Sequence, residues 1–218
     1  MIEIRDLETQ SYSDALELQV SLNGKMKQIK RQGGINENEF LLLVEHPHVY
    51  TLGKHADEFN LLVPENILAA EGIELHHINR GGDITYHGPG QLVAYPIIDL
   101  ERHHLGVKAY VSLLEQAVID TIAEFGIKGI RDDGATGVWL NDDMGLRKIC
   151  AIGVSISRSV TMHGLALNVN TDLSYFHRIN PCGFTDRGVT SIARELGHKV
   201  DMDKVKNIFT EKFISLLK

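Results

Sequence analysis

Residues 80–91 combine backbone and side chains of the kinds that a ligand-binding loop uses. The run reads Arg80-Gly81-Gly82-Asp83-Ile84-Thr85-Tyr86-His87-Gly88-Pro89-Gly90-Gln91, and four of its twelve residues are glycine. Glycine has no Cβ, so its backbone can approach a ligand closely, at a cost in conformational entropy. Apolar stretches at 73–78 and 92–98 flank the run. We therefore expect a loop that two strands hold and that binds a ligand partly through backbone amides.

Cys182 has the local surroundings of a presented thiol, in the tetrapeptide Asn180-Pro181-Cys182-Gly183. Proline restricts the chain before it and glycine relieves crowding after it. A thiol reacts near neutral pH when a nearby cation lowers its pKa, and the candidates are Lys148, His87 and His163. A small buried hydrophobic residue is the alternative interpretation of Cys182. Cys150 lies in an alternating strand pattern, which favours a packing role.

Lys148 opens an apolar strand, and its position allows two interpretations. Most lysines at such a place are solvated strand ends. A partly buried ammonium that stabilises a thiolate or polarises a carbonyl is the functional alternative. Two segments with small residues, Ala151-Ile152-Gly153 and Gly164-Leu165-Ala166, leave space either for an apolar ligand or for close packing of neighbouring elements.

Several other chemistries lack their sequence signatures. The histidines show neither the H-E-x-x-H nor the C-x-x-C spacing of zinc sites, so no metal site is expected. The chain has no G-x-S-x-G elbow and no Walker A loop. The glycines of the 80–91 run also lack the G-x-G-x-x-G spacing of dinucleotide-binding loops.

Length, charge and cysteine content indicate an ordinary globular protein. The 218 residues fit one domain, over 1–218, and 43% of them are hydrophobic. A net charge of −7 gives no electrostatic footprint for nucleic acid. Two cysteines fit a reducing compartment, and no stretch resembles a signal peptide or a membrane-spanning helix. We therefore expect a cytoplasmic protein without membrane or nucleic-acid partners.

Periodicity and capping residues predict strands interspersed with helices. An apolar face recurs at three- and four-residue steps over 107–125, with Gly126 as its end. Two strands, 136–140 and 148–157, flank a polar turn and suggest an antiparallel hairpin. Further strands are expected at 40–45, 50–52 and 165–169, and further helices at 11–31, 64–72, 190–196 and 201–213. This arrangement favours an α+β fold over a doubly wound parallel sheet.

Four segments, in this order, resemble the signature of the lipoyl(octanoyl) transferase family. They are the 80–91 run, Lys148-Ile149, His163-Gly164-Leu165-Ala166-Leu167-Asn168 and Asn180-Pro181-Cys182-Gly183. The resemblance extends from about residue 45 to residue 194. It implies a single α+β catalytic domain of the biotin/lipoate protein ligase type, with a mixed, largely antiparallel sheet flanked by helices.

The same resemblance implies a reaction and roles for residues. Octanoyl would pass from octanoyl-acyl carrier protein to a lysine of lipoyl domains, in 2-oxoacid dehydrogenases and the glycine cleavage H protein, without metal or cofactor. Cys182 would form the acyl thioester, and Lys148 would lower its pKa and act as acid and base. Substrate would contact the stretch from Arg80 to His87, together with Ala151, Ile152, Gly153, Gly164, Leu165 and Ala166.

Three other functions remain open on the sequence. An ATP-dependent lipoate or biotin ligase would need no cysteine nucleophile, a non-enzymatic acyl-carrier-binding protein would transfer nothing, and a cysteine hydrolase would need water at the acyl-enzyme. Acidic partners of a chain with a net charge of −7 would need a local basic patch. The candidates for that patch are Arg102, Lys108, Arg147, Arg158, Arg178 and Arg187.

Overall fold

The computed structural model describes residues 1–54, 56–180 and 187–217, and its main sheet has eight strands within these residues. Seven follow one another in the order β1-β2-β6-β10-β9-β8-β7, and β11 pairs with β9. Their bounds are β1 Ile2–Thr9, β2 Glu39–Glu45, β6 Gln91–Ile97, β7 Ile130–Asp132, β8 Ala135–Asp142, β9 Gly145–Ser157, β10 Val160–Asn168 and β11 Gly188–Val189. The β1–β2 and β9–β11 pairs are parallel and the others antiparallel, which confirms the mixed, largely antiparallel α+β fold.

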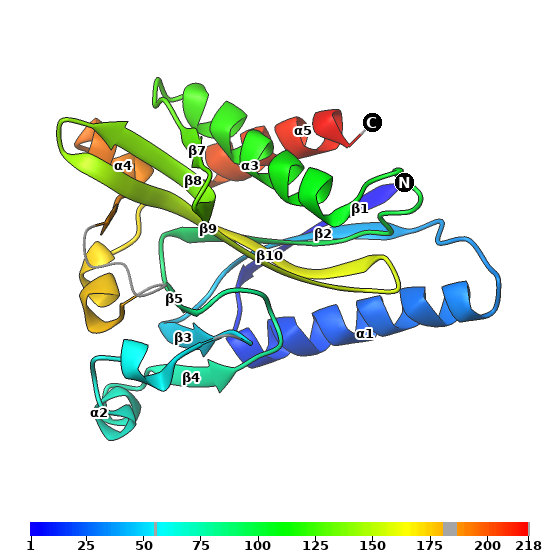
Figure 1. Cartoon of the computed structure of the whole chain (residues 1–218), viewed down its shortest axis with the longest axis horizontal. Helices are drawn as coiled ribbons and strands as arrows, with labels where there is room; N and C mark the ends of the chain where they lie inside the picture. The colour runs from blue at the N-terminus through cyan, green and yellow to red at the C-terminus, as the bar shows by residue number, and fades with distance from the viewer. Residues whose placement is uncertain (55, 181–186, 218) are drawn as a thin grey trace.

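Helices cover both faces of this sheet (Figure 1). One face carries α3 (Val107–Ala123) and α5 (Met202–Leu216), and the other carries α1 (Tyr12–Arg31). A large apolar cluster with Leu114, Cys150 and Phe209 fills the first interface, and a smaller one with Ala15 and Val93 fills the second. The burial of these apolar faces drives the layered packing.

A small three-stranded sheet stands beside the main one (Figure 1). Its order is β4 (Glu74–His77), β3 (Val49–Leu52) and β5 (Ile84–His87). A third apolar cluster, which includes Tyr50 and Phe176, packs it against the short helices α2 (Glu65–Ala70) and η2 (Leu173–Arg178). The turn η1 (Glu58–Asn60) and the helix α4 (Ile192–Leu196) complete the described elements.

Most predicted elements are confirmed, and their ends show the expected caps. Ser11 and Asp201 cap α1 and α5 through their side-chain oxygens, and Gly197 ends α4 in the left-handed conformation. Within the predicted face of α3, Val107 is exposed whereas Tyr110 and Leu114 are buried. No helix among the described residues is both long and apolar enough to span a bilayer.

One part of the prediction was wrong, and the structure contains strands that were not predicted. The 80–91 run is not a continuous loop, because β5 occupies its centre and pairs with β3. The strand β1 was not expected, because only three of its eight residues are apolar and its parallel partner β2 follows α1 in the sequence. Parallel pairing is a non-local contact, so no local pattern reports it.

Replacing Gly164 by alanine should destabilise the protein. Gly164 lies on β10, and a Cβ there would collide with the carbonyl oxygen of Ala94 and stand 2.9 Å from Pro96 Cδ. Overpacking of this kind costs about 1–3 kcal/mol, measurable as a lower midpoint in urea unfolding. Gly24 is the control, because a Cβ there meets nothing within 4 Å. Gly24→Ala in the middle of α1 should gain up to about 1 kcal/mol, and equal midpoints for the two variants would contradict the packing argument.

Candidate active site

A cavity of about 420 Å³ opens where β8 separates from β9. The strands pair as far as Cys150, and beyond it residues 151–154 of β9 border the cavity. Across the gap the 80–91 run lies against β9, since Gly81 N–H donates to Val154 O at 3.0 Å. A cavity of this size is in the range that binds small ligands.

Arg80, a buried arginine, anchors the beginning of the 80–91 run. Arg80 Nη2 donates to Thr51 O at 2.7 Å and to Thr51 Oγ1 at 2.9 Å, while Nη1 donates to Gly81 O at 3.1 Å. Gly53 and Gly153 permit this close approach, because a Cβ on either would collide with a carbonyl oxygen of the run. The glycines therefore let backbone lie on backbone at the cavity wall.

His87 presents a neutral imidazole to the cavity. Burial lowers its pKa to about 3, so it is uncharged near neutral pH. The amide Nε2 of Gln91 donates to Tyr86 O and to Asn168 Oδ1, which leaves Gln91 Oε1 to accept from His87 Nδ1 at 2.8 Å. With the proton on Nδ1, His87 Nε2 is an acceptor and can receive a hydrogen bond from a ligand.

A β-bulge brings Lys148 to the cavity. Val138 of β8 pairs with Cys150 and the next residue, Trp139, pairs with Lys148, so Ile149 is an extra residue in β9. Ile149 and Cys150 are consecutive, yet both are fully buried in the cluster beneath α3 and α5. Lys148 before the bulge and Ala151 after it both line the cavity, although they are three positions apart in the strand. In a regular strand they would face opposite sides.

The ammonium of Lys148 lies over an aromatic ring. Its Nζ is 4.5 Å from the ring centroid of Trp139, and the guanidinium carbon of Arg187 is 5.3 Å from the same centroid. Trp139 is itself held by a hydrogen bond from its Nε1 to Ala135 O, and Arg187 pairs with Asp132. Cation–π contacts of this kind favour a charged, oriented side chain.

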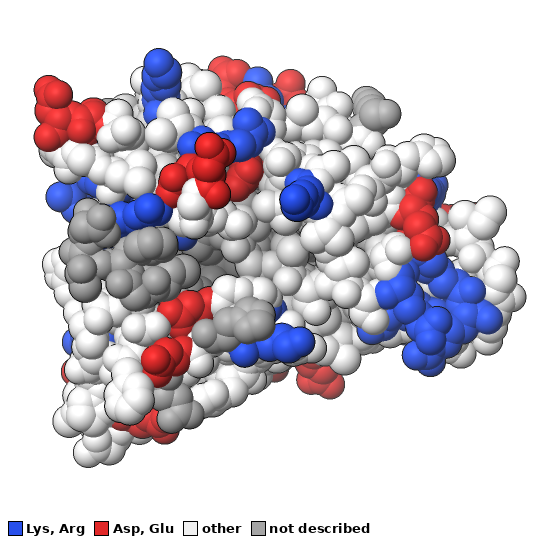
Figure 2. Space-filling model, in the orientation of Figure 1, with Lys and Arg blue, Asp and Glu red and all other residues white. Residues whose placement is uncertain are grey.

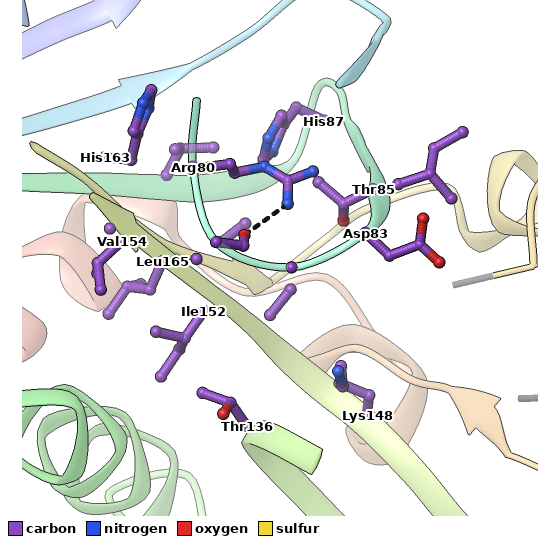
Figure 3. Close-up of a pocket in the computed structure, with 18 of the residues that line it drawn as sticks. Arg80, Asp83, Thr85, His87, Thr136, Lys148, Ile152, Val154, His163 and Leu165 are labelled. Carbon is purple, nitrogen blue, oxygen red and sulfur yellow. Dashed lines mark hydrogen bonds between the residues drawn. The ribbon is translucent and has the colours of Figure 1, made fainter. Parts of the chain in front are cut away.

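The cavity runs from Lys148 to a polar aromatic end (Figure 3). Ile152, Val154 and Leu165 lie between Lys148 and His163. Tyr12, His87 and Tyr95 also line the cavity, and Tyr12 stacks on His87 with ring centroids 6.1 Å apart. Burial lowers the pKa of His163 to about 4, and its Nδ1 has no hydrogen-bond partner among the described residues. The cavity is therefore apolar in its middle and polar at both ends.

A second, more open groove of about 1130 Å³ also borders Lys148. Asn180 and Arg187, the described residues on either side of the 181–186 segment, both line it. Val189, which lines both the groove and the cavity, pairs with Lys148 in the β9–β11 ladder. The described chain on both sides of the 181–186 segment thus lies along the groove that Lys148 borders.

The structure brings together most of the residues predicted from sequence. Those that line the cavity are Arg80, Gly81, Gly82, Asp83, Ile84, Thr85, His87, Lys148, Ala151, Ile152, Gly153, Gly164, Leu165 and Ala166. Tyr86 is not among them, because its buried ring stacks on Tyr175 and its hydroxyl bonds His48 Nδ1 at 2.7 Å. Cys182 lies outside the described residues.

Sequence reasoning missed Tyr12, Tyr95 and Thr136, which also line the cavity. Tyr95 lies in a strand whose residues are all buried, so nothing in the sequence distinguishes it from an ordinary core residue. Tyr12 follows the capping serine of α1 and carries no local signal of a site. Among the described residues, no cluster of three His, Cys, Asp or Glu side chains could hold a metal ion.

On the face of the molecule that Figure 2 shows, the densest group of basic side chains lies away from the cavity. Figure 2 shows them concentrated over the C-terminal end of α1, where the last turn carries Lys30 and Arg31. Because α1 has 20 residues and starts at the cavity with Tyr12, that end is about 30 Å away. Of the candidate patch residues, Arg102, Arg147, Arg178 and Arg187 are paired with carboxylates.

Comparisons with known proteins place this geometry in one family. Residues 11–214 match the family described as the lipoyl protein ligase A/B catalytic domain. An octanoyltransferase of Bacteroides fragilis is 53% identical over 213 residues, which cover 97% of this chain and 96% of that protein.

Solved structures of two ligases share the fold. A bipartite lipoate protein ligase of Thermoplasma acidophilum aligns with a TM-score of 0.71 at 19% identity, over 100% of this chain and 84% of that one. A biotin protein ligase of Aquifex aeolicus aligns with a TM-score of 0.51 at 12% identity, over 100% and 69%. At these identities the likeness concerns the fold alone.

The buried histidines should make the protein less stable as the pH falls from about 6.5 to 4. Burial lowers the pKa of His46 and His163 to about 4 and that of His87 to about 3. An unfolded chain protonates its histidines near pH 6.5, so in this window the unfolded state binds more protons. Each histidine then removes up to about 1.4 kcal/mol of unfolding free energy per pH unit.

His163→Asn tests this, because asparagine tolerates the left-handed backbone found there (φ 60°). Urea unfolding at several pH values should show a shallower loss of stability than in the wild-type protein. Parallel curves for the two proteins would contradict the assignment of His163 as a buried neutral imidazole.

Proposed function

The chain belongs to the lipoyl protein ligase A/B catalytic family as one of its octanoyltransferases, and we propose that it transfers octanoyl through a thioester on Cys182. The proposed donor is octanoyl-acyl carrier protein. The proposed acceptor is a lysine of a lipoyl domain, in a 2-oxoacid dehydrogenase or the glycine cleavage H protein. We take 1–218 as one catalytic domain that works in the cytoplasm, where a reducing medium keeps a catalytic thiol free.

The observation that carries the proposal is the position of Lys148. It is the only lysine among the described residues that line the cavity, and it borders the groove that also holds both flanks of the 181–186 segment. An ammonium there would lower the pKa of a nearby Cys182 thiol by stabilising the thiolate.

In the first step the Cys182 thiolate attacks the carbonyl carbon of the octanoyl thioester. The bond from that carbon to the carrier sulfur breaks, and the leaving thiolate takes a proton from the Lys148 ammonium. The products are octanoyl-Cys182, a free carrier thiol and a neutral Lys148 amine. Thioester exchanges for thioester, so the step needs no ATP.

In the second step the neutral amine of the acceptor lysine attacks octanoyl-Cys182. An amide bond forms, Cys182 leaves as the thiolate, and Lys148 takes the proton that the attacking amine gives up. The ammonium and the thiolate are thereby restored for the next cycle. Proton transfer by a positioned group contributes about 10²–10⁴ in rate.

The cavity fits an acyl chain of moderate length. Ile152, Val154 and Leu165 form its apolar middle, and each methylene buried there contributes about 0.8 kcal/mol. Next to the acyl-binding middle, the backbone of Gly81 and Gly153 forms the wall. We propose that the predicted substrate-binding residues that line the cavity contact the octanoyl chain or its carbonyl group.

A ligase that makes an acyl-adenylate is the second candidate, because ligases share this fold. Such an enzyme would need ATP and no cysteine. The requirement for ATP therefore separates the two.

Incubation with octanoyl-acyl carrier protein, without ATP, should add one octanoyl group to the protein. Intact mass should rise by about 126 Da, the adduct should map to Cys182, and a lipoyl domain should remove it. Cys182→Ala should form no adduct and transfer nothing while keeping its fold, and Cys150→Ala, the control, should still transfer. Transfer by Cys182→Ala, or transfer that appears only with ATP, would refute the covalent mechanism.

Lys148→Ala should raise the pKa of Cys182 by about one unit or more, because the thiolate loses its cation. The pH profile of alkylation at Cys182 measures this shift, and the buried Cys150 thiol does not compete for the reagent. Lys128→Ala removes an exposed lysine and is the matched control. Coincident profiles for Lys148→Ala and the control would eliminate this role of Lys148.

A further inference from the structure

Asp83 lines the cavity, but its carboxylate is directed away from the apolar middle (Figure 3). Its Oδ2 accepts from Asn60 Nδ2 at 2.6 Å, and its Oδ1 accepts from the backbone N–H of Asp57 at 3.3 Å. The turn that carries both partners is tightened by a hydrogen bond from Phe59 N–H to Asp57 Oδ1 at 3.0 Å. The carboxylate thus ties the 80–91 run to the η1 turn.

The backbone of Asn60 makes a second connection, to the chain just before Cys182. Asn60 O accepts from Asn180 N–H at 2.8 Å, and Leu62 N–H donates to Arg178 O at 2.9 Å. Between these bonds Leu61 and Ile179 form an antiparallel bridge; Ile179 belongs to the apolar cluster of the small sheet, and Leu61 packs against that cluster. Asn180 is the last described residue before Cys182, which follows it two positions later in the chain.

We propose that Asn60 is a positioning residue for the Cys182 nucleophile. Its side chain is held by Asp83 of the substrate-binding run, and its backbone holds Asn180, so the run and the chain that leads to Cys182 share one anchor. This inference rests on the proposed function of Cys182.

The electrostatics of the pair explain why a single side chain can serve as an anchor. The bond between the Asn60 amide and the Asp83 carboxylate is charge-assisted and therefore stronger than a bond between neutral groups. Both side chains are only partly exposed, which limits screening by water. Because acyl transfer depends on the relative placement of nucleophile and carbonyl, a displacement of about 1 Å costs about 10²-fold in rate.

A charge swap tests the proposal. Asn60→Asp sets two carboxylates against each other and should slow acylation of Cys182 by octanoyl-acyl carrier protein by about 10²-fold at saturating donor, with little change in the half-saturating donor concentration. The double variant Asn60→Asp/Asp83→Asn restores the bond with donor and acceptor exchanged, and it leaves an oxygen for Asp57 N–H. It should recover the rate to within about threefold of the wild-type protein.

Two further variants complete the design. Asn207→Asp makes the same change at an exposed position of α5 and should leave the rate unchanged. Asn60→Ala removes the side-chain donor without adding charge, so it replaces Asn60→Asp if that variant fails to fold, and it should lose about tenfold. The thermal unfolding midpoint of each variant is measured as well. A slow variant with an unchanged midpoint shows an effect on positioning rather than on folding.

The outcomes distinguish this inference from the proposed function. If the wild-type protein forms no adduct at Cys182, the nucleophile is misassigned and the inference falls with it. If the wild-type protein forms the adduct and Asn60→Asp or Asn60→Ala forms it equally fast, the inference alone is refuted. A folded double variant that stays as slow as Asn60→Asp also refutes the inference.

Discussion

The extra residue at Ile149 determines which side chains meet at the cavity. A bulge shifts the alternation of β9 by one, so Ile149 and Cys150 are both buried beneath α3 and α5. Lys148 consequently lies with Ala151 at the cavity and over the ring of Trp139. Without the shift, Lys148 would share the face of Cys150, where an ammonium would have to be buried among apolar side chains. The proposed acid and base of the reaction therefore owes its position to a local irregularity of the sheet.

The cavity wall depends on backbone contact that side chains would prevent. Gly81 donates to Val154 of β9 beyond the point where β8 separates from it, and Gly53 and Gly153 leave room for the run on either side of it. Arg80 holds the run through Thr51, with its guanidinium almost fully buried. Arginine in this sequence context suggests a ligand contact, yet Arg80 donates hydrogen bonds to Thr51 and Gly81 of the protein itself. Its charge still acts on the cavity, since it contributes to the lowered pKa of His163.

One fold supports ligases and transferases because the chemistry resides in a few residues at the cavity. The chain shares its architecture with lipoate and biotin ligases at 19% and 12% identity. An acyl donor that arrives as a thioester is already activated, so a thiol and a lysine suffice for the proposed transfer. Adenylate formation requires in addition a site for ATP. The difference between the two reactions is therefore compatible with a common sheet and a common cavity.

The sequence by itself determined the motifs, the family resemblance and the elements with strong local signals. Periodicity and caps report α1, α3 and α5, and a polar turn between apolar strands reports the β8–β9 hairpin, because these signals arise from neighbours in the chain. Only the tertiary structure decided the pairing of β1 with β2, the bulge at Ile149, the burial of Tyr86 against Tyr175 and the bond from Asp83 to Asn60. Each of these depends on a partner that is distant in sequence or on the phase of a strand against its neighbour. The residue types along the chain indicate neither the distant partner nor the phase of the strand, because packing between elements sets register and side-chain direction.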